Sequence, residues 1–440
     1  MDGGLVSYWR PIITALDPWR PMGREEVAAL YVERKDRPSK RLATKLRIPE
    51  PAIDIKAVVC GARGSGKSTE LTRLHRDLAT DFAVVHVDVA PGLPEGAGTA
   101  AVLALLGAAT LRLARDWTAP DADLVADAQS SAWQRFEAAA ARMGAAAGAV
   151  GRLVEAAAPI LTVFEPSAGS ALAAIGATAR SAGERVREAA ALSTELTTGA
   201  FVGALPTDKF EAARELVGAL NDALARLREL AGRQPLVLAD GLDKRRTVQD
   251  VKTVFADAQL LRDVTAPIVL TGPIHLRHLP AFKGLAGDPV ISVLPNVPVW
   301  TRRNGEVSEN PEGISLLGDL FTRRRQALGL PEGVFTEEIL HDAAAASSGI
   351  VREFLEILVW SAESAFERGH RTVDREDVDA AVRNLRIRIQ GYLDEPALST
   401  LNLVLRRGTL PGRENADVLL FQNIIACYEN GDLWFRPHQT

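Results

Sequence analysis

Cysteine is scarce in this sequence, and so is any excess of charge. The chain has 2 cysteines, Cys60 and Cys427, in 440 residues, which argues against a disulfide scaffold and against a zinc site. The net charge of -5 at pH 7 gives no electrostatic case for bulk binding of nucleic acid or of an anionic membrane. The N-terminus has no cationic segment followed by an apolar one, so no signal peptide is predicted and the cytoplasm is the expected location.

The residues that are present suit a protein with sizeable hydrophobic cores. Hydrophobic residues make up 47% of the chain and charged residues 24%, which is ordinary for a soluble protein. A length of 440 residues favours about two or three domains.

One glycine-rich segment carries the clearest chemistry. Residues 61–68 read Gly-Ala-Arg-Gly-Ser-Gly-Lys-Ser and match G-x-x-x-x-G-K-[ST] without a mismatch. An apolar run precedes them, and leucines at helical spacing follow, which is the strand–loop–helix context that a phosphate-binding loop needs. We expect Lys67 to reach the β- and γ-phosphates and the Ser68 hydroxyl to hold Mg²⁺. The phosphate-binding residues are predicted to be Gly61, Ala62, Arg63, Gly64, Ser65, Gly66, Lys67, Ser68 and Thr69.

Five short apolar runs predict a parallel sheet that is buried on both faces. They lie within residues 51–310, the predicted ATPase core, and residues 1–50 are read as a lead-in with an irregular start. A predicted helix over Asp208–Ala231 leads into the third strand. The predicted strands are Ala57–Cys60, Phe82–Val89, Pro235–Asp240, Pro267–Thr271 and Pro289–Leu294.

A long segment rich in alanine and glycine, residues 96–205, interrupts this core. Within it, Trp133–Met143 reads as a helix. Residues 156–179 have little charge, so contact with a membrane is one interpretation. Prolines, glycines and many alanines dilute their apolar character below that of a spanning helix. The alternative is an inserted helical hairpin that packs on the ATPase core or on a partner.

The remaining chain predicts helices and a small terminal unit. Residues 311–393 read as a helical lid. Residues 394–440 contain two helices and then two apolar runs around Asn430-Gly431, a strong hairpin signal. This order predicts a winged-helix-like unit at the C-terminus.

The acidic end of the third strand is the second part of the candidate site. Asp240 ends an apolar strand, at the sheet edge where α/β folds bind ligands, and it is predicted to hold Mg²⁺ directly or through water. Many hydrolytic P-loop proteins have a glutamate at the next position, which here is Gly241. Asp243 has two open interpretations: it polarises the attacking water, or it pairs with Lys244, Arg245 or Arg246.

Three further features are candidate phosphate contacts. Thr271 ends the fourth strand and would lie beside the γ-phosphate if that strand lies between the first and the third. Arg352 lies in the first turn of a predicted helix, where a cation opposes the helix dipole and so needs a reason, such as a γ-phosphate. The run Arg323–Arg325 is read mainly as a solvated helix face, or else as an arginine supplied to a neighbouring subunit; Arg34 is a weaker candidate near the base.

In this order of motifs the chain resembles the AAA+/STAND group of P-loop ATPases. The lid and tail look most like the branch with origin-recognition and helicase-loader ATPases and STAND signalling ATPases. The resemblance covers roughly residues 25–95 and 205–440. It rests on Gly61–Ser68, Leu236–Asp243, Pro267–Thr271, Ser348–Leu355, the lid end Val373–Val382 and the terminal unit.

The resemblance implies an α/β fold with a five-stranded core in the order 5-1-4-3-2. It also implies ATP and Mg²⁺ bound between core and lid, and assembly into a homo-oligomer that depends on nucleotide. Thr271 then matches the sensor 1 position and Arg352 the sensor 2 arginine. The implied catalytic set is Lys67, Asp240, Asp243, Thr271 and Arg352, while Gly241 and Thr271 depart from the usual residues and predict slow hydrolysis.

Three functions remain open from the sequence. The first is a cytoplasmic ATPase switch that signals to a separate effector protein, with bacterial stress or phage defence suggested by analogy only. The second is a DNA-binding ATPase of the replication-initiator or transposition-helper kind, although acidic residues offset the arginines of the tail. The third is a nucleotide-binding scaffold that does not hydrolyse ATP.

Overall fold

The computed structural model defines the fold over most of the chain. It describes residues 3–20, 22–35, 38–48, 55–93, 95–118, 131–143, 154, 207–245, 247–278, 290–412 and 414–439. The segment 156–179, which raised the question of membrane contact, lies outside these ranges. Among the described helices, none combines the length and the apolar character that a membrane crossing requires.

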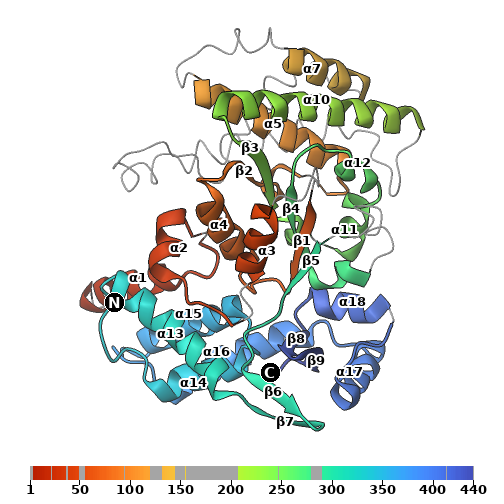
Figure 1. Ribbon diagram of the computed structural model, residues 1–440. Coiled ribbons are helices and arrows are strands. Elements are labelled where there is room, and N and C mark those ends of the chain that lie inside the picture. Colours follow the sequence, from red (N-terminus) through yellow and green to blue (C-terminus); the bar gives the residue numbers. More distant parts are fainter. Residues whose placement is uncertain are drawn as a thin grey trace.

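A five-stranded parallel sheet forms the centre of the molecule (Figure 1). Its order, β2-β3-β4-β1-β5, confirms the order that the resemblance implied. The predicted strands are all present, with bounds that differ by one or two residues. The strands are β1 Lys56–Gly61, β2 Phe82–Asp88, β3 Gln234–Asp240, β4 Ile268–Pro273 and β5 Val290–Leu294.

Helices cover both faces of the sheet, as the unbroken apolar strands require. Side chains alternate along β1, so Ala57 and Val59 pack with α3 (Pro38–Arg47) and α4 (Lys67–Leu78). Val58 and Cys60 belong to the larger core on the opposite face. Short elements complete this part: α2 Arg24–Leu30, η1 Ala90–Gly92, η2 Leu242–Lys244, α11 Val248–Val254, α12 Gln259–Arg262 and η3 Ile274–His278.

Three helices stack at the top of the view in Figure 1. They are α5 (Thr99–Thr118), α7 (Ser131–Met143) and α10 (Thr207–Ala231). Phe136 of α7 packs so closely on α5 that a Cβ at Gly107 would lie 2.2 Å from its ring. Residues of α5 and α7 share a hydrophobic core with residues of the sheet, such as Val85 and Val237, so the described part of residues 96–205 packs on the central fold.

The lid consists of four helices and is joined by the N-terminus of the chain. Here the prediction of an irregular start was wrong, because residues 3–16 form a helix, α1 (Gly3–Leu16). Trp9 of α1 is buried in the lid core, and its indole Nε1 donates to the carbonyl oxygen of His370 at 2.9 Å. The lid helices are α13 Pro311–Ala327, α14 Glu337–Ala346, α15 Val351–Glu367 and α16 Arg375–Gln390.

The C-terminal unit has the predicted order of two helices and a hairpin. The turn lies at Gly431, whose φ is +99°. A second hairpin, β6–β7, was not predicted and packs near the end of α17, where Arg302 donates to the carbonyl oxygen of Arg407 at 2.7 Å. The elements are β6 Trp300–Arg303, β7 Glu306–Glu309, α17 Glu395–Arg407, α18 Glu414–Phe421, β8 Ile425–Asn430 and β9 Asp432–Pro437.

Candidate functional site

The glycine-rich loop joins β1 to α4 as the sequence predicted. Residues 61–68, called the phosphate loop below, place Lys67 and Ser68 in the first turn of α4, where free backbone N–H groups and the helix dipole favour an anion. The Nζ of Lys67 is buried and donates to the carbonyl oxygens of Gly61 at 3.0 Å and of Ala62 at 2.7 Å. These two hydrogen bonds hold the Lys67 side chain folded back over the phosphate loop.

Asp243 is the ion-pair partner of Lys67. It follows β3 in the short helix η2, and its Oδ2 lies 2.8 Å from Nζ of Lys67. Burial alone would raise the pKa of Asp243, but Lys67 outweighs this effect and holds that pKa below its ordinary value. The structure thus gives Asp243 a partner that neither of the two interpretations named, since it pairs with Lys67 while Lys244 pairs with Asp88.

The predicted position of Thr271 depended on its strand lying between the first and the third, and this condition is met. Strand β4 lies between β1 and β3, and the buried hydroxyl of Thr271 donates to Oδ1 of Asp243 at 3.3 Å. The same hydroxyl accepts a hydrogen bond from the backbone N–H of Gly241 at 2.9 Å. Because its hydroxyl both donates and accepts a hydrogen bond, Thr271 fixes the position of Asp243 as well as lying near the phosphate loop.

Asp88 is a candidate site residue that the sequence reading missed. It ends β2 in register with Asp240 of β3, and Nζ of Lys244 lies 2.7 Å from Oδ2 of Asp88 and 3.9 Å from Oδ2 of Asp240. Burial raises the pKa of Asp88, and Lys244 partly offsets the increase. The only signal in the sequence was an acid at the end of an apolar strand, a position shared with Asp240.

The geometry at Gly241 explains why no glutamate occupies this position. Its φ is +90°, a left-handed conformation that favours glycine. A Cβ there would lie 2.3 Å from Oδ1 of Asp88 and 2.8 Å from the Cβ of Ala90. Asp88 therefore fills the space into which a side chain at position 241 would have to extend.

The oxygen donors at this edge suit Mg²⁺. Ser68 offers a hydroxyl in the first turn of α4, and Asp240 offers a buried carboxylate at the end of β3. Hard oxygen ligands that complete a shell with phosphate and water are the set that Mg²⁺ prefers. Lys244, beside Asp240, would have to share that carboxylate with the ion.

Arg352 lies on the opposite side of the phosphate loop, in the first turn of α15. Its backbone N–H donates to the carbonyl oxygen of Gly64 at 3.1 Å, and a Cβ at Gly64 would lie 2.5 Å from its own Cβ. Burial lowers the pKa of Arg352, Asp243 raises it, and the nearby charge of Arg63 lowers it further. The lid is therefore packed directly on the phosphate loop, and Arg352 is close enough to Asp243 for their opposite charges to attract.

The other arginines named from the sequence bind within the chain. Arg34 is buried behind the phosphate loop and donates to the carbonyl oxygens of Ser65 at 3.3 Å and Pro295 at 2.5 Å. In the 323–325 run, Arg323 donates to the carbonyl oxygen of Tyr31, the buried Arg324 to that of Ala15, and Arg325 pairs with Glu332. These contacts do not favour a role for the run in a neighbouring subunit.

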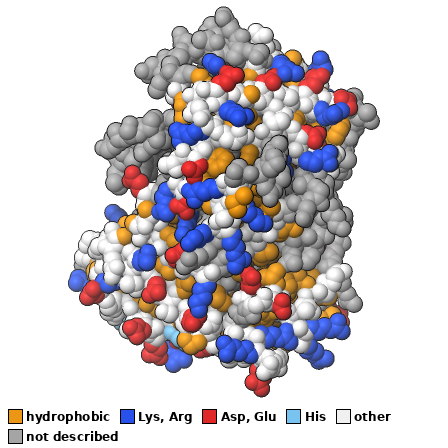
Figure 2. Space-filling model, viewed as in Figure 1, with side chains coloured by type: hydrophobic (Ala, Val, Ile, Leu, Met, Phe, Trp, Pro, Cys, Tyr) orange, Lys and Arg blue, Asp and Glu red, His pale blue; other side chains and the backbone are white. Residues whose placement is uncertain are grey.

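A group of arginines lies around the second hairpin. Arg302 of β6 donates to the carbonyl oxygens of Arg407 and Arg406 at the end of α17, Arg303 follows it in β6 opposite Glu306 of β7, and Arg436 of β9 stacks 4.0 Å from the centre of the Trp300 ring. Figure 2 shows Lys and Arg side chains gathered at the lower right, in the region where Figure 1 places α17 and the β6–β7 hairpin. We call these five arginines the basic surface.

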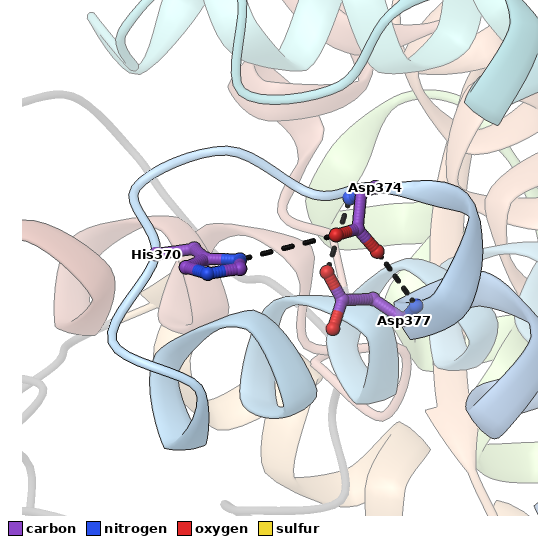
Figure 3. Close-up of side chains that lie close together, drawn as sticks. All are labelled: His370, Asp374 and Asp377. Carbon is purple, nitrogen blue, oxygen red and sulfur yellow. Dashed lines mark hydrogen bonds and ion pairs between the residues drawn. The ribbon is translucent and has the colours of Figure 1, made fainter.

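One acidic cluster in the lid has the composition of a cation site (Figure 3). It consists of His370, Asp374 and Asp377. Asp374 and Asp377 form the capping box of α16, in which the backbone N–H of each donates to the carboxylate of the other, and Oδ1 of Asp377 also accepts from Ser364 at 2.7 Å. Arg368 lies within 3.0 Å of both carboxylates. The cluster is thus explained as a helix cap neutralised by arginine.

No protein-family model matches the sequence, and no curated protein matches it. Solved structures resemble the chain only distantly. The Orc1 protein of Aeropyrum pernix in complex with DNA is 14% identical, with a TM-score of 0.39, over 97% of this chain and 93% of that one. Cdc6p from Pyrobaculum aerophilum is 13% identical, with a TM-score of 0.40, over the same shares of the two chains.

The Orc2 protein of Aeropyrum pernix, in ADPNP–ADP complexes, is also 13% identical, with a TM-score of 0.39, over 96% of this chain and 93% of that one. These comparisons do not support the STAND branch of the resemblance. At such identities and scores they add nothing about function, so the proposals below rest on the chain's own residues.

Proposed function

We propose that the protein binds ATP with Mg²⁺ in the phosphate loop, hydrolyses it slowly, and uses nucleotide occupancy as a switch. The observation that carries this proposal is the direct packing of the lid on the loop. Arg352 and Gly64 share a backbone hydrogen bond, and Lys67 with Asp243 lies across the same loop. A γ-phosphate bound there would be touched by core and lid together.

Slow hydrolysis is expected from the ion pair that Asp243 forms. A carboxylate whose pKa is lowered by an ion pair is a weak base toward water, and Asp243 is held in that state by Lys67. We expect single-turnover hydrolysis on the order of 10⁻³ to 10⁻² per second, as in P-loop proteins that lack their activator. Turnover of tens per second by the purified chain alone would refute the switch.

Replacing Arg352 by alanine should weaken ATP binding about tenfold or more and leave ADP binding nearly unchanged. The reason is that a charge-assisted bond to the γ-phosphate is lost, and such bonds contribute about 1.5–3 kcal/mol. Calorimetric titration with ADP and a non-hydrolysable ATP analogue measures the ratio. Arg371→Ala is the matched control, since its guanidinium also stacks on a ring, that of Tyr8, but in the lid. An unchanged ratio in Arg352→Ala would contradict the proposed contact.

Hydrogen bonds join the C-terminal unit to the phosphate loop and to the start of α15. The side-chain Nδ2 of Asn423 donates to the carbonyl oxygen of Arg63 at 2.9 Å and to Oε1 of Glu353 at 3.2 Å. Tyr428 donates to the carbonyl oxygen of Ser348 at 2.8 Å, and His438 lies 2.8 Å from Oε2 of Glu353. A change in the loop or in α15 would therefore shift the unit that carries part of the basic surface.

The basic surface makes nucleic acid the second candidate, and a better supported partner than a separate effector protein. The sequence reading counted the arginines of the tail against its acids, but the fold adds Arg302 and Arg303 from β6. Side chains that gather positive charge on one face bind phosphate backbones and make the affinity depend on salt.

The triple variant Arg303→Ala, Arg406→Ala, Arg407→Ala should bind duplex DNA at least tenfold more weakly at low salt. Each lost phosphate contact should also reduce the slope of log K against log salt by about 0.9. A fluorescence-anisotropy titration at several salt concentrations measures both values. The triple variant Arg214→Ala, Arg226→Ala, Arg228→Ala on α10 is the control with the same charge change. Equal losses in the two triple variants would show a general charge effect and refute a specific surface.

Assembly into a homo-oligomer on ATP binding remains part of the proposal. The particle size with ADP and with a non-hydrolysable ATP analogue tests it, and equal sizes at equal protein concentration would contradict nucleotide-driven assembly.

A further inference from the structure

A cavity of about 140 Å³ lies where the phosphate loop, the lid and the C-terminal unit meet. The side chains that matter in its lining are Trp19, Arg63, Arg352, Tyr392, Phe421 and Asn423. Lys67, Asp240 and Asp243 do not line it. The cavity therefore adjoins the phosphate site and shares Arg63 and Arg352 with it, but not the ion pair of Lys67 with Asp243.

Two cations face this cavity without a carboxylate partner. Within the described part of the chain, neither Arg63 nor Arg352 forms an ion pair, and their charges repel each other. Each guanidinium instead stacks on a ring, Arg63 at 5.3 Å from the centre of Phe421 and Arg352 at 4.4 Å from that of Trp19. Two neighbouring guanidinium groups in this state are stabilised by an anion placed between them.

The carboxylates of the lining do not supply that anion. Glu356 pairs with Arg388 at 2.9 Å, and Glu353 lies 2.8 Å from His438 and 3.6 Å from Arg388. Both acids are thus already engaged by other partners, and the two stacked arginines remain available to a ligand.

The rest of the lining selects a flat ligand. Trp19 and Tyr392 are 65% and 48% exposed, so their rings are open to contact from outside. Oδ1 of Asn423 is buried and accepts no hydrogen bond from the described residues, which leaves an acceptor for an N–H or O–H group. A cavity of about 150 Å³ holds a benzene ring, so this one admits a single ring system.

We propose that this cavity is a second ligand site that binds a small planar anion, one aromatic ring system carrying a phosphate or carboxylate group. The ring lies against the exposed aromatic side chains, and the acidic group lies between Arg63 and Arg352. This coupling rests on the function proposed above: where Arg352 also contacts the γ-phosphate, a ligand in the cavity competes for that arginine and couples the cavity to the nucleotide switch.

Two probes distinguish the sources of this chemistry, namely phenyl phosphate for an aryl phosphate and salicylate for an aromatic carboxylate. Calorimetry on the full chain should show saturable binding of at least one of them. Tyr392→Ala and Arg63→Ala should each weaken it at least tenfold, and the control Arg371→Ala should leave it within about twofold. No binding of either probe at millimolar concentration overturns the proposal, as does binding that neither variant weakens.

The same titration in Lys67→Ala separates this site from the phosphate loop. Binding of the probe should stay within about threefold while ATP binding is lost, with near-ultraviolet circular dichroism confirming the fold at the assay temperature. If Lys67→Ala does not fold, Lys67→Met with Asp243→Leu replaces it. Loss of the probe in a folded variant would assign the cavity to the nucleotide site; it would overturn this inference and leave the proposed function intact.

Discussion

Replacement of Lys67 by alanine should abolish ATP binding and destabilise the fold at the same time. In the proposed function its ammonium group is the cation that the phosphate loop presents to the β- and γ-phosphates, so its loss should weaken ATP binding at least 100-fold. It is also the buried partner of Asp243, and the two side chains are only 2% and 10% exposed. Removing one member of a buried pair costs about 3–5 kcal/mol, because the other charge is left uncompensated.

The two effects can be separated with a second variant. In Lys67→Met with Asp243→Leu both charges are replaced by apolar groups, a change that is often neutral or stabilising for a buried pair. Chemical denaturation should therefore show stability recovered, while calorimetry shows ATP binding still lost. Lys40→Ala, an exposed lysine of α3, controls for the loss of one positive charge. Normal ATP binding by folded Lys67→Ala would refute nucleotide binding in this loop.

The phosphate loop and the sheet could be predicted from the sequence because both depend on local patterns. The glycines, Lys67 and the flanking apolar runs lie within one stretch of chain, and five apolar segments identify a buried parallel sheet. The order of the strands was predicted from the resemblance to a known family, because the sequence of a strand does not determine which strand lies beside it. Once that order is known, Thr271 follows, because β4 lies between β1 and β3.

Features that depend on distant contacts could not be predicted. Helix α1 contains Pro11 and its sequence pattern is typical of an irregular segment. The helix is stabilised by Trp9, which is buried against the lid, more than 300 residues later in the sequence. Strand β7 of the second hairpin is exposed along its whole length, and even its one apolar residue, Val307, is 41% exposed. The pairing of Asp88 with Lys244 joins the end of β2 to η2, which follows β3, and only the fold brings these two segments together.

Replacing Gly241 by glutamate, the residue that many hydrolytic P-loop proteins have at this position, should destabilise the protein and leave hydrolysis no faster. A non-glycine residue at φ +90° costs about 1–3 kcal/mol in backbone strain. The new Cβ would also approach Oδ1 of Asp88 to 2.3 Å, and overpacking of this kind costs about 1–3 kcal/mol more. Denaturant unfolding and single-turnover hydrolysis measure the two consequences.

Two controls divide that cost into its parts. Gly232 also has a positive φ, +62°, but nothing lies within 4 Å of its Cβ position, so Gly232→Ala should lose only the strain of about 1–2 kcal/mol. Gly241→Ala should lose more, because its methyl group meets Asp88. Equal losses at the two glycines would show that Asp88 does not exclude a side chain.

The double variant Gly241→Glu with Asp88→Ala is the decisive case. Without the Asp88 carboxylate, the closest contact to the new side chain is removed, while the Cβ of Ala90 still lies 2.8 Å from the Cβ position, and Lys244 loses the partner that holds it at 2.7 Å. If the excluded glutamate is what keeps the proposed hydrolysis slow, the double variant should hydrolyse ATP at least tenfold faster than Asp88→Ala alone. A rate equal to that of Asp88→Ala would place the limit elsewhere, in the ion pair between Asp243 and Lys67, whose lowered pKa makes that carboxylate a weak base.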